Sequence, residues 1–402
     1  MIGISKLYCG VVEPGDVLRY HRRGEKLPSH LVQFAKHKKP VVVYNCTRRC
    51  NLKCAHCYSA SANVEYEDEL TTIEAKEMID SLARLGSPVI LFSGGEPTMR
   101  SDLLELMEHA SQKGLRIVIS TNGTLLTDDF LKSAKEIGLS YIGVSLDGLR
   151  EVNDRFRGVT GSFDKALDGI RRTIGHGIKA GLRFTINRRN AQEIDGIFDL
   201  MEMEKIPRIC FYHLVYSGRG SKLVKEDLSH EETREVVDLI IDRTAAMHAS
   251  GFPAEVLTVD NHADGPYLYM RMLRENHPNA DNVMELMLMN GGNSSGNGIG
   301  CVSWDGEVYA DQFSRDRSFG NVRNRPFDEI WTDTSNEIMA QFKNKYPHVT
   351  GRCRDCRFLY VCGGNFRIRA ESVTGELWGV DPACYLTDEE ISGDRFTPED
   401  EK

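Results

Sequence analysis

Long apolar runs and a secretory signal are both missing from this sequence. The longest apolar stretches, such as Val89-Ile90-Leu91-Phe92, are far shorter than the roughly 20 residues that span a bilayer. Residues 1–7 have neither the basic region nor the apolar core of a signal peptide. The sequence therefore predicts no membrane span, and we expect a cytoplasmic protein.

Positive charge is also in short supply, and cysteine is sparse. The 402 residues carry a net charge of −9, whereas general nucleic-acid binding needs a broad basic face. Eleven cysteines are too dilute for a disulfide scaffold, and cytoplasmic thiols stay reduced. We therefore expect no nucleic-acid partner, and we interpret clustered cysteines as metal ligands or catalytic groups.

Short β-branched runs alternate with amphipathic segments over the first 250 residues, as in successive βα units. Thr71 with Glu74, and Ser229 with Glu232, carry the capping-box signature of helix starts. Six units fit a partial (β/α)6 TIM-type barrel better than a closed eight-fold one, although an open doubly wound sheet has the same period. The expected strands cover residues 41–45, 89–93, 116–120, 141–146, 182–187 and 209–215.

The rhythm of βα units breaks beyond about residue 250. Residues 291–298 are rich in Gly, Asn and Ser and indicate a loop, and five cysteines follow with little regular periodicity. We expect an N-terminal extension at 1–40, the barrel at 41–250, a linker region at 251–300, a cysteine-rich domain at 301–390 and an acidic tail at 391–402.

Three cysteines, Cys50, Cys54 and Cys57, follow the first expected strand at the carboxyl-end mouth of a barrel, where active sites are built. Three thiolates suit zinc or an iron–sulfur cluster. Structural zinc needs a fourth ligand, and His56 lies in a short loop that would strain such a site. A four-iron cubane held by three cysteines instead leaves one iron open to a small molecule.

The Cys50-x3-Cys54-x2-Cys57 spacing resembles the signature of the radical S-adenosylmethionine (SAM) superfamily. The resemblance continues in Ser93-Gly94-Gly95-Glu96-Pro97, which is similar to the family element that receives the SAM amino group. It implies a [4Fe–4S] cluster on the three cysteines. It also implies that one electron cleaves SAM to a 5′-deoxyadenosyl radical, which abstracts a substrate hydrogen.

Further segments at strand ends, 120–123 and 144–148, resemble family segments around the SAM ribose and carboxylate. Glycines in such segments let backbone approach a ligand closely. The SAM-binding residues that the resemblance implies are Gly94, Gly95, Glu96, Asn122, Ser145 and Asp147.

A second group, Cys353, Cys356, Cys362 and Cys384, supplies four soft ligands, and its spacing alone is as compatible with zinc as with iron–sulfur. The group resembles the SPASM/twitch extensions of radical SAM enzymes, which implies an auxiliary [4Fe–4S] cluster. Cys301 is an alternative fourth ligand. Phe366 and Asp311 stand where two-cluster SPASM domains carry cysteine, so we expect no third cluster.

The N-terminal stretches 7–20 and 27–31 resemble tetrapyrrole-processing radical SAM enzymes of the siroheme-dependent haem route. This likeness implies removal of the two acetate side chains of 12,18-didecarboxysiroheme to give iron-coproporphyrin III. Side-chain processing in haem d1 synthesis, oxidative decarboxylation of coproporphyrin propionates and SPASM-type peptide modification are the alternatives within the enzymes. A metal-bound carrier of a tetrapyrrole is the non-enzymatic alternative, and the SAM-type element argues against it.

A polycarboxylate macrocycle that approaches an acidic protein needs arginines at the barrel mouth. Such arginines could equally be solvated surface charges. The candidates at strand ends are Arg48, Arg49, Arg188, Arg189 and Arg219. The family chemistry also implies a one-electron donor such as flavodoxin or ferredoxin.

Overall fold

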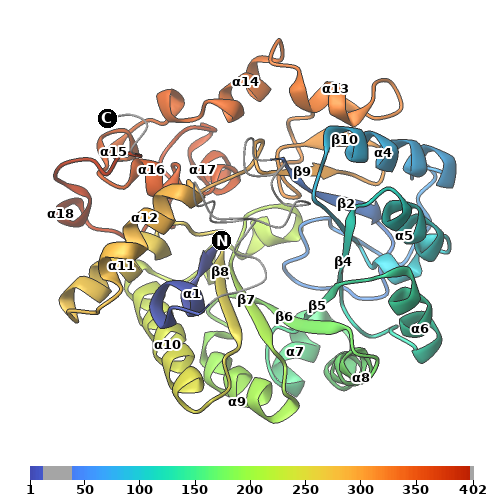
Figure 1. Cartoon of the computed structure of the whole chain (residues 1–402), viewed down its shortest axis with the longest axis horizontal. Helices are drawn as coiled ribbons and strands as arrows, with labels where there is room; N and C mark the ends of the chain where they lie inside the picture. The colour runs from blue at the N-terminus through green and yellow to red at the C-terminus, as the bar shows by residue number, and fades with distance from the viewer. Residues whose placement is uncertain (12–38, 399–402) are drawn as a thin grey trace.

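The structure is a computed structural model that describes residues 1–11 and 39–398 (Figure 1). Most of the expected N-terminal extension, including the stretch 27–31 and most of 7–20, lies outside the described residues, as does 399–402 of the acidic tail.

The described strands form one open mixed sheet of 11 strands, in the order β1-β8-β7-β6-β5-β4-β3-β2-β9-β10-β11. Strands β2 to β8 run parallel to one another, and β1 pairs antiparallel with β8 at one edge. The strands are β1 (Ile2–Gly3), β2 (Val41–Thr47), β3 (Val89–Gly94), β4 (Arg116–Thr121), β5 (Tyr141–Ser145), β6 (Lys179–Ile186), β7 (Arg208–His213), β8 (Glu255–Val259), β9 (Ile299–Val302), β10 (Glu307–Tyr309) and β11 (Gly320–Asn321).

Helices connect the parallel strands and cover the outer face of the sheet (Figure 1). Those that follow β1 to β8 are α1 (Ile4–Cys9), α4 (Thr72–Leu85), α5 (Leu103–Gln112), α6 (Asp128–Ile137), α7 (Arg150–Arg157), α8 (Ser162–Gly175), α9 (Ile194–Glu204), α10 (His230–Ala249), α11 (Asp264–Arg274) and α12 (Ala280–Asn290). The C-terminal ones are α13 (Phe327–Thr332), α14 (Glu337–Lys343), α15 (Arg352–Asp355), α16 (Leu359–Cys362), α17 (Arg367–Thr374) and α18 (Asp388–Ile391). None of the described helices combines the length and apolar character of a bilayer span.

The fold class and both capping boxes are confirmed. All six expected strands are present, and the Thr71 and Ser229 hydroxyls accept from the backbone N–H groups of Glu74 and Glu232. A seventh parallel strand, β8, was missed. Its five residues are all buried, so its sequence lacks the alternation that marks a half-exposed strand. The expected linker region, 251–300, holds β8, α11 and α12.

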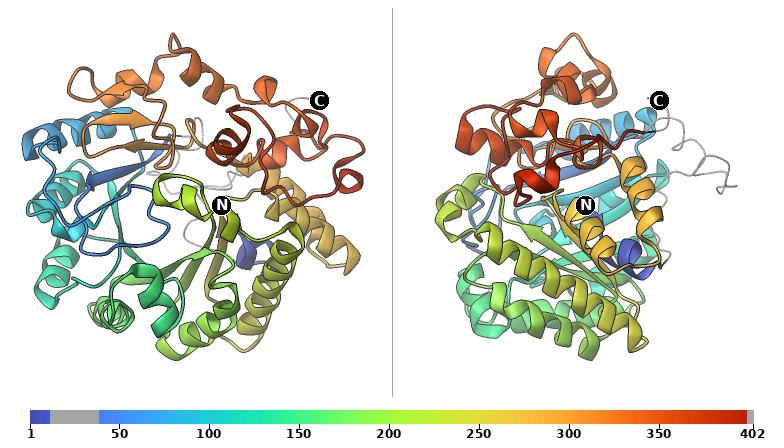
Figure 2. Two further views of the ribbon diagram at one scale, coloured as in Figure 1. Left: turned by 180° about the vertical axis from the view of Figure 1, so that it is seen from behind. Right: turned by 90° about the vertical axis from the view of Figure 1, so that its left-hand side faces the viewer.

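The C-terminal region continues the sheet of the barrel. Strand β9 runs parallel to β2, with Val43 opposite Cys301 and Tyr44 opposite Val302. Both views of Figure 2 show the C-terminal segments, orange to red, gathered at one end of the molecule, away from α8 and α9. The edge of β2 that would close a complete barrel is therefore used to attach the C-terminal region.

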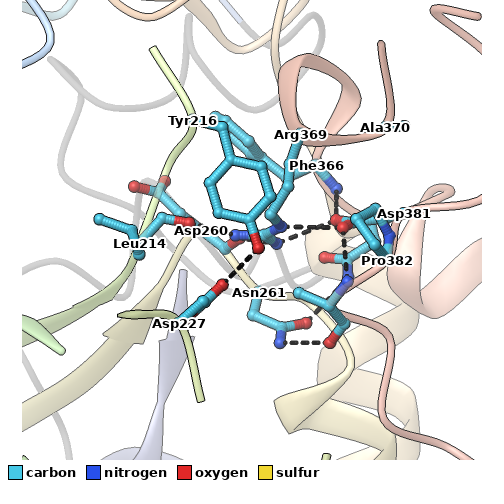
Figure 3. Close-up of polar contacts among 12 residues, drawn as sticks. Leu214, Tyr216, Asp227, Asp260, Asn261, Phe366, Arg369, Ala370, Asp381 and Pro382 are labelled. Atoms are coloured by element: carbon cyan, nitrogen blue, oxygen red, sulfur yellow. Dashed lines mark hydrogen bonds and ion pairs between the residues drawn. The ribbon is translucent and has the colours of Figure 1, made fainter. Parts of the chain in front are cut away.

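A buried guanidinium joins the C-terminal region to the carboxyl ends of β7 and β8 (Figure 3). Arg369 is fully buried and pairs with both carboxylate oxygens of Asp381, at 2.8 and 2.9 Å. Two further N–H groups of this guanidinium donate to the backbone oxygens of Leu214, at 2.9 Å, and Asp260, at 2.6 Å. The backbone N–H groups of Phe366 and Ala383 complete the shell around the Asp381 carboxylate.

Replacing Asp381 with asparagine removes one charge and leaves the Arg369 guanidinium buried without its counter-ion. We expect Asp381→Asn to destabilise the fold by about 3–5 kcal/mol. Asp164→Asn, which breaks the exposed pair with Arg150, is the matched control and should cost less than about 1 kcal/mol. Thermal unfolding of both anaerobic variants, followed by circular dichroism, checks this, and equal shifts of the two midpoints would contradict it.

Candidate active site

The loop after β2 gathers its three thiols at one buried point. Cys50 and Cys54 are 7% and 8% exposed and pack together with Cys57. The loop is pinned to the end of α7, because the N–H groups of Lys53 and Ala55 donate to the carbonyls of Arg157 and Phe156. Backbone pairing to a neighbouring helix thus holds the three cysteines in place before any ligand binds.

Burial disfavours the ionised form of two of these thiols, those of Cys50 and Cys54. Burial, together with the neighbouring Cys54 and Cys57 thiols, raises the pKa of Cys50 to about 12. Coordination to a metal deprotonates such thiols outright. In the described part of the chain, no three His, Cys, Asp or Glu side chains are close enough to hold a single metal ion. Three thiols are one ligand short of a four-coordinate structural zinc site.

His56 does not complete a zinc site. Its ring stacks on Phe156 with centroids 4.6 Å apart, and its Nε2 faces the Asp147 carboxylate at 3.7 Å. Burial lowers the pKa of His56 to about 4, so the ring is neutral at physiological pH. The residue packs beside the thiol group as a wall of the site.

The segment after β3 lies against this loop with no room for side chains. A Cβ at Gly94 would come within 2.2 Å of the Thr47 carbonyl oxygen, and one at Gly95 within 2.2 Å of that of Arg49. Gly94 also has a φ of +127°, which L side chains rarely adopt. The N–H groups of Gly95 and Glu96 donate to these two carbonyls, so the glycines bring β3 into backbone contact with the cysteine loop.

Glu96 is turned inward and fully buried. Its carboxylate accepts from the N–H and hydroxyl of Thr98, the Thr121 hydroxyl at 2.6 Å and the Asn122 N–H at 2.7 Å. Burial raises the pKa of Glu96, and these hydrogen bonds oppose the rise. The carboxylate ties the ends of β3 and β4 together.

Asn122 follows β4, Ser145 ends β5 and Asp147 follows it, all at the same edge of the sheet. The Asn122 amide donates to Asn51 of the cysteine loop at 2.7 Å, and Ser145 lines the central cavity. Asp147 is fully buried, accepts from the Thr185 N–H at 2.7 Å and forms an ion pair with Arg157.

Arg157 is a site residue that the sequence analysis missed. It ends α7, is 6% exposed, and lines the cavity while its Nη1 donates to Cys54 Sγ at 3.5 Å. A lone arginine in a helix carries no motif, so only the packing of α7 on the cysteine loop reveals it.

A cavity of about 100 Å³ opens at the carboxyl ends of the strands. It is bounded by His56, Ser145 and Arg157 beside the thiol group, and by Arg183, Tyr212 and Asp260 from β6, β7 and the end of β8. Residues beside the thiol group and residues from β6, β7 and the end of β8 therefore line one cavity.

None of the five arginines proposed from the sequence lines this cavity. Arg188 and Arg189 pair with Glu232 and Glu226 at 2.7 and 2.8 Å on the surface. Arg49 contacts Asn63 and Glu65. A place at a strand end in the sequence does not show whether an arginine side chain faces the surface, as these three do, or the cavity, as Arg157 and Arg183 do.

The other two arginines brace the cysteine loop. Arg219 donates to the Cys54 carbonyl at 2.8 Å and the Ser61 carbonyl at 2.9 Å. Arg48 donates to the Ser59 carbonyl and lies over the Trp304 ring at 5.1 Å.

The second cysteine group comes together around α15, α16 and the segment before α18. Burial and the neighbouring Cys384, Cys353 and Cys356 thiols raise the pKa of Cys362. Cys384 is likewise affected by Cys353, and burial raises its pKa to about 11. The four thiols thus share one buried region, a complete ligand set for one closed cluster.

Cys301 lies elsewhere, on β9, where the Asn45 amide donates to its sulfur at 3.4 Å. Asp311 accepts from the N–H groups of Phe313 and Ser314, and the Phe366 ring packs on Phe313 with centroids 5.6 Å apart. These three positions serve packing and turn geometry in the structure.

Comparison with known proteins identifies the chain by sequence and by fold. The radical SAM superfamily profile matches residues 44–201, and SPASM, an iron–sulfur cluster-binding domain, matches 296–357. Fe-coproporphyrin III synthase of Methanosarcina barkeri is 66% identical over 97% of this chain and 99% of that protein. Pre-heme d1 synthase of Dinoroseobacter shibae is 40% identical over 87% of each.

Solved structures agree in fold. Native anSMEcpe with bound AdoMet matches 86% of this chain and 94% of its own length, with a TM-score of 0.67 at 18% identity. A sequence identity of 18% supports a shared fold and nothing further. Together with the two sequence relatives, it establishes that the chain belongs to the radical SAM superfamily and carries a C-terminal SPASM domain.

Proposed function

We propose that this protein removes the two acetate side chains of 12,18-didecarboxysiroheme and so produces iron-coproporphyrin III. The observation that carries the proposal is the 66% identity to Fe-coproporphyrin III synthase, which extends over 97% of the chain. The 40% identity to pre-heme d1 synthase makes haem d1 side-chain processing the second candidate. The chain is a radical SAM enzyme in either case, so the two candidates differ in the tetrapyrrole that they produce.

The cysteine loop holds the catalytic cluster in this proposal. Cys50, Cys54 and Cys57 bind a [4Fe–4S] cluster with three thiolates, which leaves the fourth iron for SAM. When bound, the cluster and SAM supply one-electron chemistry that removes hydrogen from an unactivated carbon. Arg157, whose guanidinium reaches both Cys54 and the cavity, suits the carboxylate of SAM.

The remaining SAM-binding candidates divide into two kinds. Gly94, Gly95, Asn122 and Ser145 offer backbone or side-chain polar groups at the strand ends. Glu96 and Asp147 are fully buried and act through the groups that they hold, which are the ends of β3 and β4 for Glu96 and the Arg157 guanidinium for Asp147. These two carboxylates are positioning residues.

The second cysteine group binds an auxiliary [4Fe–4S] cluster through Cys353, Cys356, Cys362 and Cys384. Cys384 lies near the other three thiols, whereas Cys301 lies apart from them on β9. This supports Cys384 as the fourth ligand. The catalytic cluster draws its electron from a small cytoplasmic donor of the flavodoxin or ferredoxin kind.

The function is tested by anaerobic incubation of the reconstituted protein with reductant, SAM and 12,18-didecarboxysiroheme. We expect mass spectrometry to show a tetrapyrrole that has lost two acetate units, and Cys50→Ala to abolish the loss. Formation of 5′-deoxyadenosine with an unchanged tetrapyrrole would contradict the substrate while leaving the radical SAM chemistry intact.

The ligand assignment is tested by iron and sulfide analysis after anaerobic reconstitution. Two [4Fe–4S] clusters correspond to about eight irons per chain. We expect about four in Cys50→Ala/Cys54→Ala/Cys57→Ala and about four in Cys353→Ala/Cys356→Ala/Cys362→Ala, because each variant loses one cluster. Cys301→Ala is the control and should keep about eight, whereas a loss of iron in this variant would overturn the choice of Cys384.

A further inference from the structure

Arg183 is a cation of the barrel interior that forms no salt bridge in the described part of the chain. It lies on β6 between Ser145 of β5 and Cys210 of β7, and it lines the central cavity. Its guanidinium carbon lies 4.5 Å from the centroid of the Tyr212 ring, with no hydrogen-bonded or ion-paired partner among the described residues. The guanidinium donors are thus left for a ligand.

The fold makes room for this arginine. A Cβ at Gly143 of β5 would come within 3.0 Å of Arg183 Cδ, so the absence of a side chain there lets the arginine stem cross the neighbouring strand. The Tyr212 ring supports the guanidinium from β7 through a cation–π contact. The side chain is therefore held in the cavity wall before any ligand arrives.

Asp260 is a second polar residue of the cavity wall that has an atom without a hydrogen-bond partner among the described residues. It follows β8 with a φ of +66°, a left-handed conformation that is uncommon outside glycine. Arg369 holds its backbone carbonyl at 2.6 Å (Figure 3). The side-chain Oδ2 is buried and has no hydrogen-bond partner among the described residues, and the residue lines the cavity.

The protonation of Asp260 suits a site for an anion. Burial raises its pKa to about 7, and Asp311 adds to the rise. Arg369, the Met1 amino group and Arg183 oppose it, and the Tyr212 hydroxyl faces it from β7. Below pH 7 the carboxyl group is largely neutral and donates a hydrogen bond, whereas above pH 7 it is an anion that repels another carboxylate.

We propose that Arg183 and Asp260 form the subsite that binds the carboxylate of the substrate acetate arm. The inference rests on the proposed function and deepens it, because it states where the reacting side chain enters. Arg183 and Asp260 line the same cavity as Arg157 and Ser145, which lie beside the thiol group, so a side chain bound at the first pair is directed toward the residues assigned to SAM. The acetate arm is the part of the substrate that has to approach the chemistry, while the propionates stay outside.

The test compares binding of two tetrapyrroles to the anaerobic holoenzyme by absorbance titration. 12,18-Didecarboxysiroheme carries the acetate arms, whereas iron-coproporphyrin III lacks them and keeps the propionates. We expect Arg183→Met to weaken binding of the first by about 30-fold and that of the second by less than about threefold. Arg171→Met, which removes an exposed arginine paired with Glu204, is the matched control and should change neither.

Arg183→Lys guards against a folding defect of the methionine variant, and iron content is measured for both. Lysine keeps the charge but loses the planar guanidinium. We therefore expect Arg183→Lys to bind didecarboxysiroheme with an affinity between that of wild type and that of Arg183→Met. Equal affinity of wild type and both variants for didecarboxysiroheme would overturn the subsite. An equal loss of affinity for both tetrapyrroles would also overturn the subsite, because Arg183 would then not distinguish a substrate with acetate arms from one without them.

Asp260→Asn tests the second half of the subsite. We expect wild type to bind didecarboxysiroheme about tenfold more weakly at pH 8 than at pH 6, because the neutral form of a group with a pKa of about 7 falls by that factor. Asparagine tolerates the left-handed backbone and stays neutral, so Asp260→Asn should bind as tightly as wild type at pH 6 and lose the pH dependence. A variant that keeps the wild-type pH profile would contradict the role of Asp260.

Failure of this inference and failure of the proposed function give different results. If wild type neither binds nor converts didecarboxysiroheme, the proposed function is wrong. If wild type converts it and the Arg183 variants bind it normally, the function stands and the subsite is wrong.

Discussion

The buried ion pair between Arg369 and Asp381 is the interaction on which the arrangement of the active site depends. Its guanidinium spans the C-terminal region and the carboxyl ends of β7 and β8, where it takes the carbonyls of Leu214 and Asp260. A buried charge is tolerated when it is paired and hydrogen-bonded, and here four acceptor atoms surround the guanidinium. The Arg369–Asp381 pair therefore links the C-terminal region directly to the wall of the cavity.

The site itself combines groups that burial makes costly to ionise with groups that stay open to a ligand. Glu96 and Asp147 are enclosed by internal donors and fix the strand ends. Burial raises the pKa of the Cys50 and Cys54 thiols, and Arg183 keeps its donors toward the cavity. The protein thus supplies binding and orientation, and the cofactors supply the difficult chemistry.

Sequence patterns predicted the elements whose signals are local. Strands β2 to β7, the capping boxes of α4 and α10, and both cysteine groups carry periodicity or spacing that can be recognised without a structure. Strand β8 escaped because all of its residues are buried and do not alternate. The five arginines at strand ends were chosen by position, and the structure places none of them on the cavity.

The sequence by itself determined the chemistry of this protein, because the cysteine spacing and the glycines at the end of β3 are short-range features that mark a radical SAM enzyme. The tertiary structure decided which polar residues face that chemistry. Arg157, Arg183 and Asp260 come from α7, β6 and the end of β8, and no motif connects them along the chain. They meet because parallel strands bring their carboxyl ends to one edge of the sheet, and this convergence appears only when the chain is folded.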